Sequence, residues 1–255
     1  MLDTRTAAIV APIAFLVLVV LAWQLLCALS GISALVLPAP TDVVAALVQE
    51  WGPISEAALR TVSEMLIAVA IATAVGVVLG FGVAQSEAVH ATVYPFLVAI
   101  QSAPKIAIAP IALLWFGTGM GTPVLMGFIM AVFPIVVATE AGFRSVHHEL
   151  HELATSMRAS WGKRFRKISL PSALPSMMSG FRIAVAQSIT GIIVAEFVQE
   201  SGGLGFVIVN AASHGQSSVA FAVLVVLAAI ALVAIGLVGL AERVGARWMR
   251  GYSNS

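Results

Sequence analysis

Residues Glu149–Pro171, ELHELATSMRASWGKRFRKISLP, form the only long polar and strongly basic stretch of a 255-residue chain. Hydrophobic residues make up 60% of the chain and charged residues 10%. Soluble domains carry about 25% charged residues, so this composition indicates an integral membrane protein. The basic stretch lies between two membrane-length apolar segments, and its pattern predicts two short helical pieces followed by a stop at Pro171. We expect a loop of this kind to contact a partner.

The apolar segments predict the number of membrane crossings, because a helix needs about 20 apolar residues to span the hydrocarbon core. Six segments meet or nearly meet this requirement, so we predict one all-α domain over residues 1–255 with six transmembrane helices. Pro95, Pro104 and Pro110 interrupt the third segment, and Pro134 lies inside the fourth. The predicted helices cover residues 7–29, 59–84, 93–115, 123–142, 181–198 and 219–240, with a loop over 143–180.

The placement of Lys and Arg predicts the orientation, since cytoplasmic loops are enriched in these residues. With the N-terminus in the cytoplasm, the cytoplasmic regions hold 11 of the 13 basic residues, whereas the outer loops at 30–58 and 199–218 hold none. We therefore predict that both termini and the 143–180 loop are cytoplasmic. Basic residues in that loop also suit anionic lipid headgroups.

Composition and motifs exclude several classes of function. A net charge of +1 gives no electrostatic reason to expect nucleic-acid binding. The single cysteine, Cys27, rules out an internal disulfide, and the phosphate-binding pattern G-x-x-x-x-G-K-[ST] does not occur. Three nearby histidines on the basic loop resemble a metal cluster, but without cysteines we interpret them as a solvated helix face and predict no metal site. They are His147, His148 and His151.

The membrane segments contain several residues that need an explanation. Gly76 and Gly80 have the spacing that lets helices approach closely, either inside one chain or between two copies. Glu64 lies near the outer end of the second segment, where we expect it to find a hydrogen-bond partner. In the first outer loop, Thr41 or Asp42 is expected to cap a short helix.

The third segment is the most interrupted, and it carries a charge near mid-span. Lys105 follows Pro104, and prolines in membrane helices are tolerated where the backbone is buried in protein or lines a cavity. An ammonium at this depth must face protein or water. We predict that Gln101, Pro104, Lys105 and Glu196 line a pathway; in the alternative, Glu196 or carbonyls freed by the prolines only neutralise Lys105.

The basic stretch has a distinctive register: Glu152-Leu153-Ala154, three residues, Arg158, nine residues, Ile168, one residue, Leu170-Pro171. It closely resembles the EAA loop of the binding-protein-dependent ABC importer permeases, E-A-A, three residues, Gly, nine residues, Ile-x-Leu-Pro. Two positions depart from this pattern. Leu153 replaces an alanine, and Arg158 stands where the family prefers Gly, so the turn there takes a strained left-handed conformation or is shaped differently, with Gly162.

The resemblance covers nearly the whole chain. The stretches LPAPTDVVAAL, APKIAIAPIALLWFG, FPIVVATEAGFRSV, VAEFV and GGLGFVI are similar to members that serve nitrate, sulfonate, taurine, riboflavin and thiamine-precursor pyrimidine importers. It implies a type I importer fold in the bacterial inner membrane. It also implies alternating access for a small organic anion, sulfonate or nitrate, or for a thiamine-precursor-like heterocycle.

The resemblance further implies the partners. They are a second permease copy, most simply an identical one, two ATPase subunits that carry ATP and Mg, and an extracytoplasmic solute-binding protein. This chain itself would hold no cofactor and catalyse no reaction. Two short helices of the loop would enter a groove on the ATPase, and helical spacing places apolar residues on one docking face. The implied coupling residues are Glu149, Leu150, Glu152, Leu153, Ala154, Met157, Arg158, Ser160, Ile168, Leu170 and Pro171.

Two other interpretations stay open from the residues alone. In an ion-coupled secondary transporter or channel without an ATPase, Glu64, Lys105 and Glu196 would form a relay. That interpretation does not explain the register of the basic loop. A structural membrane scaffold is the third interpretation, and Lys105 and Glu196 at membrane depth argue against it.

Overall fold

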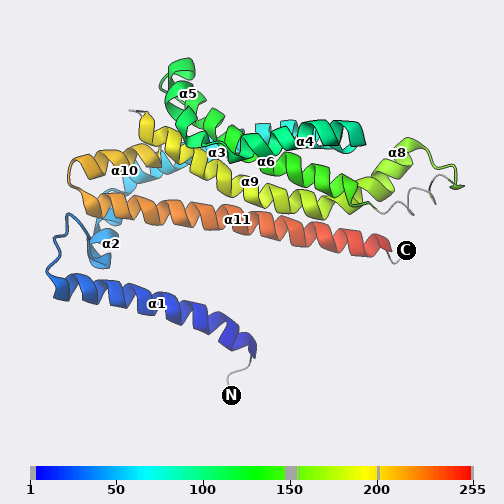
Figure 1. The fold of residues 1–255 in the computed structure, drawn as a ribbon. Coiled ribbons are helices and arrows are strands. Elements are labelled where there is room, and N and C mark those ends of the chain that lie inside the picture. Colours follow the sequence, from blue (N-terminus) through cyan, green and yellow to red (C-terminus); the bar gives the residue numbers. More distant parts are fainter. Residues whose placement is uncertain (1–3, 147–153, 155, 200–201, 254–255) are drawn as a thin grey trace.

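The computed structural model describes residues 4–146, 154, 156–199 and 202–253, and for 4–9 and 244–253 it describes the backbone only. Every regular element in these residues is a helix, which confirms the all-α class (Figure 1). In chain order the elements are α1 (Thr4–Ser30), α2 (Pro40–Gln49), α3 (Trp51–Ala84), α4 (Glu87–Ser102), the 3-10 helix η1 (Lys105–Ile108), α5 (Ala109–Phe116), α6 (Gly121–Arg144), α8 (Trp161–Arg164), the π-helix η2 (Phe165–Ser169), α9 (Leu170–Val198), α10 (Leu204–Ser213) and α11 (Ser217–Ser253).

The membrane spans agree with the predicted six. Among the described residues, five helical stretches are long and apolar enough to cross a bilayer, and α4 with η1–α5 gives a sixth when counted as one broken span. The break bends that pair by 79°. Pro104, which precedes η1, lacks the N–H that would continue α4, so the third segment is two helices rather than one.

Several helices extend beyond their predicted ends. The second span starts at Trp51 rather than residue 59, and helical structure covers much of the loop predicted at 143–180. Pro171 lies in the first turn of α9, where a missing N–H costs nothing, so it does not stop the chain as predicted. The predictions followed apolarity, whereas helices continue past the hydrocarbon boundary with polar residues.

The centre of the bundle is α6, which packs along α9 and α3. Small residues permit this approach: a Cβ on Gly80 would lie 2.5 Å from the Val136 carbonyl oxygen, and one on Gly76 2.8 Å from Ile135 Cγ2. A Cβ on Gly191 of α9 would likewise lie 2.5 Å from the Met126 carbonyl oxygen. The Gly76–Gly80 pair therefore serves packing inside one chain, the first of the two predicted uses.

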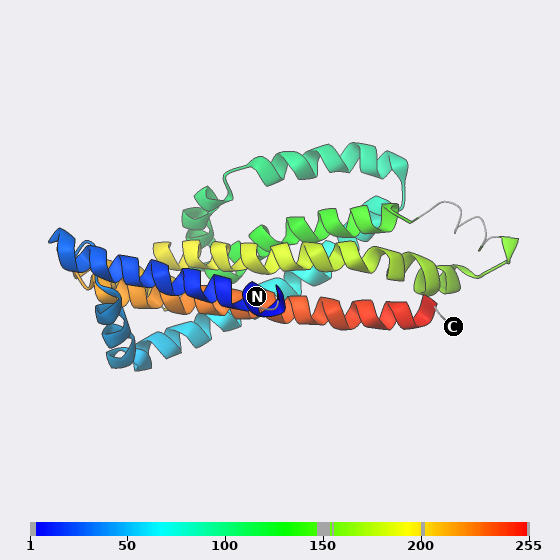
Figure 2. The ribbon, with the colours of Figure 1, turned by 90° about the horizontal axis from the view of Figure 1, so that it is seen from below.

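Two helices lie at the edges of the molecule. Helix α1 lies apart from the bundle along most of its length and reaches it through α2 and through Trp23, whose ring lies 5.9 Å from the ring of Phe221 in α11 (Figure 1). Seen from below, α4 forms one flank, and it contains no buried residue (Figure 2). The short helix expected in the first outer loop is α2, where the Asp42 carboxylate accepts a hydrogen bond from Ala39 N–H at 3.3 Å.

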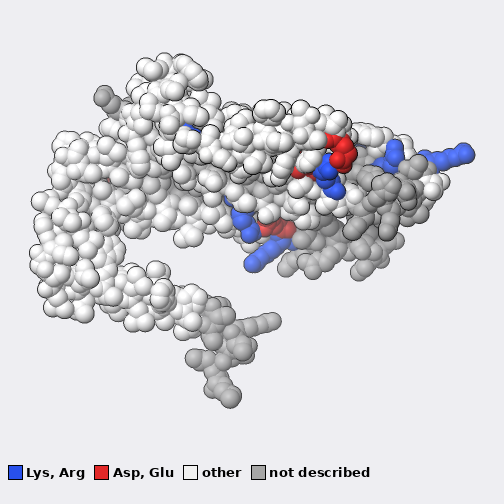
Figure 3. Space-filling view, viewed as in Figure 1, with Lys and Arg blue, Asp and Glu red and all other residues white. Residues whose placement is uncertain are grey.

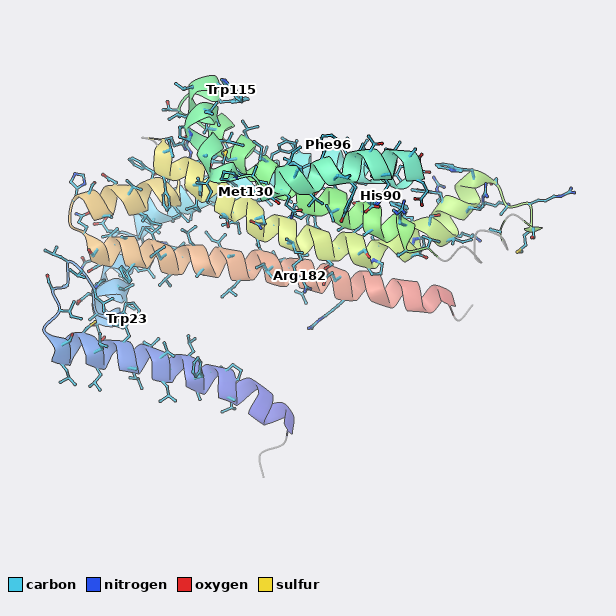
Figure 4. All side chains as sticks on the ribbon, viewed as in Figure 1. Trp23, His90, Phe96, Trp115, Met130 and Arg182 are labelled. Atoms are coloured by element: carbon cyan, nitrogen blue, oxygen red, sulfur yellow. The ribbon has the colours of Figure 1, made fainter. Side chains whose placement is uncertain are left out.

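Charge is concentrated at one end of the bundle. In Figure 3 most of the visible face is uncharged, and the Lys, Arg, Asp and Glu side chains gather toward the end that carries α8. We call this the basic end, and the opposite end, at the turn between α10 and α11, the α10 end. The Arg182–Glu242 ion pair joins α9 to α11 on the basic half, and Figure 4 shows Arg182 extending from α9 beside α11.

Candidate coupling segment and membrane pathway

The turn before α8 is closed by a residue in the left-handed region. Arg158 has φ 50°, and Ala159 N–H donates a hydrogen bond to the Ala154 carbonyl oxygen at 2.9 Å. This bond and the positive φ are typical of a helix that ends in a Schellman motif, where glycine is preferred. Of the two shapes predicted for the turn, the strained one is present: Gly162 lies inside α8 and Arg158 adopts the conformation that favours glycine.

The residues predicted for coupling fall into two groups. Glu149, Leu150, Glu152 and Leu153, and with them the three histidines, lie outside the described residues. Among the others, Ala154 is 5% exposed and Met157 74% exposed, so Met157 presents an apolar side chain outward while Ala154 packs inward. Ser160 precedes α8 and is exposed, whereas three residues are half-buried where the chain enters α9: Ile168, Leu170 and Pro171.

Four aromatic rings connect this segment to the bundle, a feature that the sequence analysis missed. Phe165 of η2 contacts three rings: Trp161 at 5.4 Å, Phe143 at 5.9 Å and Phe81 at 5.5 Å between centroids. Phe143 ends α6 and Phe81 lies near the end of α3, and they contact each other at 4.9 Å. The i, i+4 spacing of Trp161 and Phe165 was the available signal. We call these four residues the aromatic cluster.

An ion-pair network at the basic end joins α4 to α6, and it too was not predicted. Glu140 of α6 lies 2.8 Å from His90 Nδ1 and 3.3 Å from Arg144 Nε, and Arg144 also pairs with Glu87 at 2.9 Å. His90 stacks on Tyr94, and Figure 4 shows it between α4 and α6. The network attaches the end of α4 that follows α3.

The predicted pathway residues separate into two places. Gln101 and Pro104 are exposed beside the break between α4 and η1, and Lys105 is half-buried there with its ammonium 4.9 Å from the Phe133 ring centroid. A lysine over an aromatic face is stabilised by the ring quadrupole. Glu196, by contrast, is 0% exposed, so in this conformation it lines no open surface.

Glu196 is held in a polar cluster near the α10 end instead of pairing with Lys105. Its two carboxylate oxygens accept hydrogen bonds from the Thr61 hydroxyl and from Gly205 N–H, both at 2.6 Å. Glu64 is also 0% exposed, and Arg60 Nε donates to it at 3.1 Å. The expected partner of Glu64 is therefore present. The three residues of the hypothetical relay are divided between these two places.

Comparison with known proteins agrees with this architecture. The family model for the binding-protein-dependent transport system inner membrane component matches residues 72–248. A riboflavin transport system permease protein from Chloroflexus aurantiacus is 33% identical over 239 residues, covering 93% of this chain and 89% of the relative. A putative aliphatic sulfonates transport permease protein from Bacillus subtilis is 28% identical over 236 residues, covering 90% of this chain and 84% of the relative.

A third relative and a solved structure add to this result. A formylaminopyrimidine transport permease protein from Halalkalibacterium halodurans is 32% identical over 200 residues, covering 76% of this chain and 78% of the relative. A chain of the inward-facing MetNI methionine ABC transporter superposes with TM-score 0.64 at 20% identity, over 80% of this chain and 97% of that chain. Fold, family model and relatives agree, and the chain belongs to the binding-protein-dependent transport system inner membrane components, the permeases of ABC transporters.

Proposed function

We propose that this chain is the transmembrane subunit of a bacterial ABC importer and works by alternating access. Two copies enclose the pathway in the inner membrane, with both termini and the basic end in the cytoplasm. Two ATPase subunits, which bind ATP and Mg²⁺, contact the segment that runs from Glu149 to Pro171. A solute-binding protein delivers the substrate at the α10 end. Closure of the ATPases moves the two coupling segments together and opens the pathway outward.

The observation that carries this proposal is the attachment of the coupling segment to the bundle. Phe165 contacts the ends of both α3 and α6 through the aromatic cluster, and η2 leads without a break into α9. A displacement of α8 by a partner is therefore transmitted to three membrane helices. A loop that only set the topology would need no such packed connection.

The substrate class follows from the relatives and from the surroundings of Lys105. The names of the relatives include aliphatic sulfonates, formylaminopyrimidine and riboflavin, which are anions or flat heterocycles. Lys105 supplies a positive charge and Phe133 an aromatic ring beside the exposed break in the third span. We propose a small organic anion, a sulfonate, nitrate or a thiamine-precursor-like heterocycle as the transported solute.

Purification and uptake test this function directly. The chain purified from its native membrane should elute with a nucleotide-binding subunit, and proteoliposomes of that complex with its binding protein should take up solute only with ATP. Lys105→Met should lower uptake about tenfold, the effect of losing about 1.4 kcal/mol of solute contact, while assembly and basal hydrolysis persist. Arg243→Met, which removes an exposed positive charge on α11 outside the coupling segment, is the matched control and should leave uptake unchanged.

Two results would contradict the proposal. A transport-competent preparation that contains no nucleotide-binding chain would exclude an ABC importer, and uptake driven by an ion gradient alone would favour the secondary transporter. Normal uptake by Lys105→Met with every tested solute would remove Lys105 from the pathway without affecting the rest of the proposal.

A further inference from the structure

A groove of about 640 Å³ opens at the basic end, on one side of α8 and η2. Its lining combines two aromatic rings with three basic side chains: Trp161, Phe165, Lys163, Arg166 and Lys167. The three basic residues are spaced by three and four positions, which brings side chains to one face of a helix. Gly162 leaves the groove open, since a Cβ there would meet no atom within 4 Å. We call this feature the basic groove.

The positive charge of the basic groove is not neutralised within the part of the chain that the structure describes. Lys163, Arg166 and Lys167 are exposed and form no ion pair with a described residue. The sequence contains no Asp or Glu from Leu153 to Ala195. The acidic side chains described on the basic half are paired with other cations: Glu87 and Glu140 with Arg144, and Glu242 with Arg182. The basic groove therefore favours an anionic ligand.

The aromatic cluster places the basic groove at the level where two membrane spans end. Phe165 of the groove contacts Phe81 near the end of α3 and Phe143 near the end of α6, and both helices are candidate spans. The basic residues of the groove are adjacent to Phe165 or two positions from it, so they lie where the charged headgroups of a bilayer lie. Trp161 is 63% exposed and stacks on Phe165 with 9° between the ring planes. Tryptophan is enriched at this boundary because its ring is amphipathic.

We propose that the basic groove binds the headgroup of an anionic phospholipid. The planar guanidinium of Arg166 suits a bidentate contact with the phosphate, and the two lysine ammonium groups add positive charge. The exposed indole of Trp161 covers the glycerol and the start of the acyl chains. A free phosphate ion would use the cations but not this ring, so the lining as a whole favours the lipid. The proposal assigns this side of α8 and η2 to the membrane and leaves the turn at Arg158, with the residues before it, to the ATPase.

Quenching of tryptophan fluorescence by brominated lipids tests the site in the full-length chain. The measurement needs neither ATPase nor substrate, so its outcome is independent of the proposed function. The chain is reconstituted in phosphatidylcholine vesicles, and a rising fraction of the lipid is replaced by phosphatidylglycerol brominated near the start of its acyl chains. Phosphatidylcholine brominated at the same position is the reference. The anionic lipid should quench wild-type protein at a lower fraction than the reference, and Trp161→Phe should remove this difference.

Single substitutions of matched charge separate the groove from the general positive charge of the basic end. Arg166→Gln should weaken the preference for phosphatidylglycerol about fivefold, since a basic residue near a membrane surface contributes about 1 kcal/mol. Arg243→Gln removes an exposed positive charge on α11 outside the groove and should leave the preference unchanged. The same preference should persist in the complex of the chain with its ATPase subunits.

Four results would overturn the proposal. Equal quenching of wild-type protein by the two brominated lipids would show that the groove has no anionic lipid, whatever the variants do. An equal loss in Arg166→Gln and Arg243→Gln would indicate diffuse surface charge in place of a site. Displacement of the lipid by inorganic phosphate, but not by chloride at the same ionic strength, would make a free anion the ligand. Displacement by bound ATPase subunits would assign the groove to the ATPase.

Discussion

At the scale of single residues, Arg158 adopts a backbone conformation that normally favours glycine. Its φ of 50° is in the left-handed region, which costs a non-glycine residue about 1 kcal/mol. Arg158→Gly removes this strain but makes the unfolded chain more flexible, which costs about 0.4–1 kcal/mol. We therefore expect unchanged stability and unchanged ATP-driven uptake in Arg158→Gly.

Arg158→Val gives the contrasting result, since a β-branched residue is a genuine outlier in this region. We expect the turn to open and uptake to fall while hydrolysis by the ATPase continues. The measurement is the ratio of solute taken up to ATP hydrolysed in proteoliposomes. A normal ratio in Arg158→Val would show that the left-handed turn is not needed for coupling.

At the scale of elements, the connection between α8, η2 and α9 is packed against the bundle by aromatic rings. The π-helix places Phe165 between three rings, and each aromatic pair contributes about 0.5–1.5 kcal/mol. Phe165→Ala should therefore destabilise the junction by about 2–3 kcal/mol. We expect hydrolysis to persist and uptake to be lost, because α8 is no longer attached to α3 and α6.

Phe15→Ala is the matched control, because Phe15 is 70% exposed on α1 and lies outside both the coupling segment and the aromatic cluster. Its effect on uptake should be much smaller. If the two variants behave alike in the uptake-to-hydrolysis ratio, the aromatic cluster does not transmit the movement, although the chain would remain an importer subunit.

At the scale of the whole molecule, the proposed pathway lies on an open face of a single chain. Gln101 and Pro104 are exposed, and α5 protrudes beside them with Trp115 near its tip (Figure 4). We expect a second copy to close this face. In a Cys27→Ser background, Leu114→Cys should form a cross-linked dimer, since Leu114 is 84% exposed on α5. Denaturing electrophoresis without reductant measures the dimer.

The choice of position follows from the packing of α5. Ala112 is 0% exposed, so Ala112→Cys serves as the matched control that should not cross-link. Native mass spectrometry provides an independent check of the composition. A complex with one permease chain for two ATPases would contradict the homodimer.

The sequence by itself determined the membrane class and the family, and it predicted the spans, the orientation and the coupling segment. These follow from local properties: apolar length, the distribution of Lys and Arg, and the register from Glu152 to Pro171. It also indicated close helix packing at Gly76 and Gly80. Such features depend on the composition of each segment and need no knowledge of its neighbours.

The tertiary structure decided which distant residues meet. Thr61 and Glu196 are 135 positions apart, and nothing in either segment predicts their contact or the enclosure of Glu196. The same holds for Phe81, Phe143 and Phe165, which come from three elements. The bend of 79° and the helical extension toward Leu170 also lay beyond a reading of apolarity. Contacts of this kind are fixed by how α3, α6 and α9 pack together, which is a property of the assembled bundle and not of any one helix.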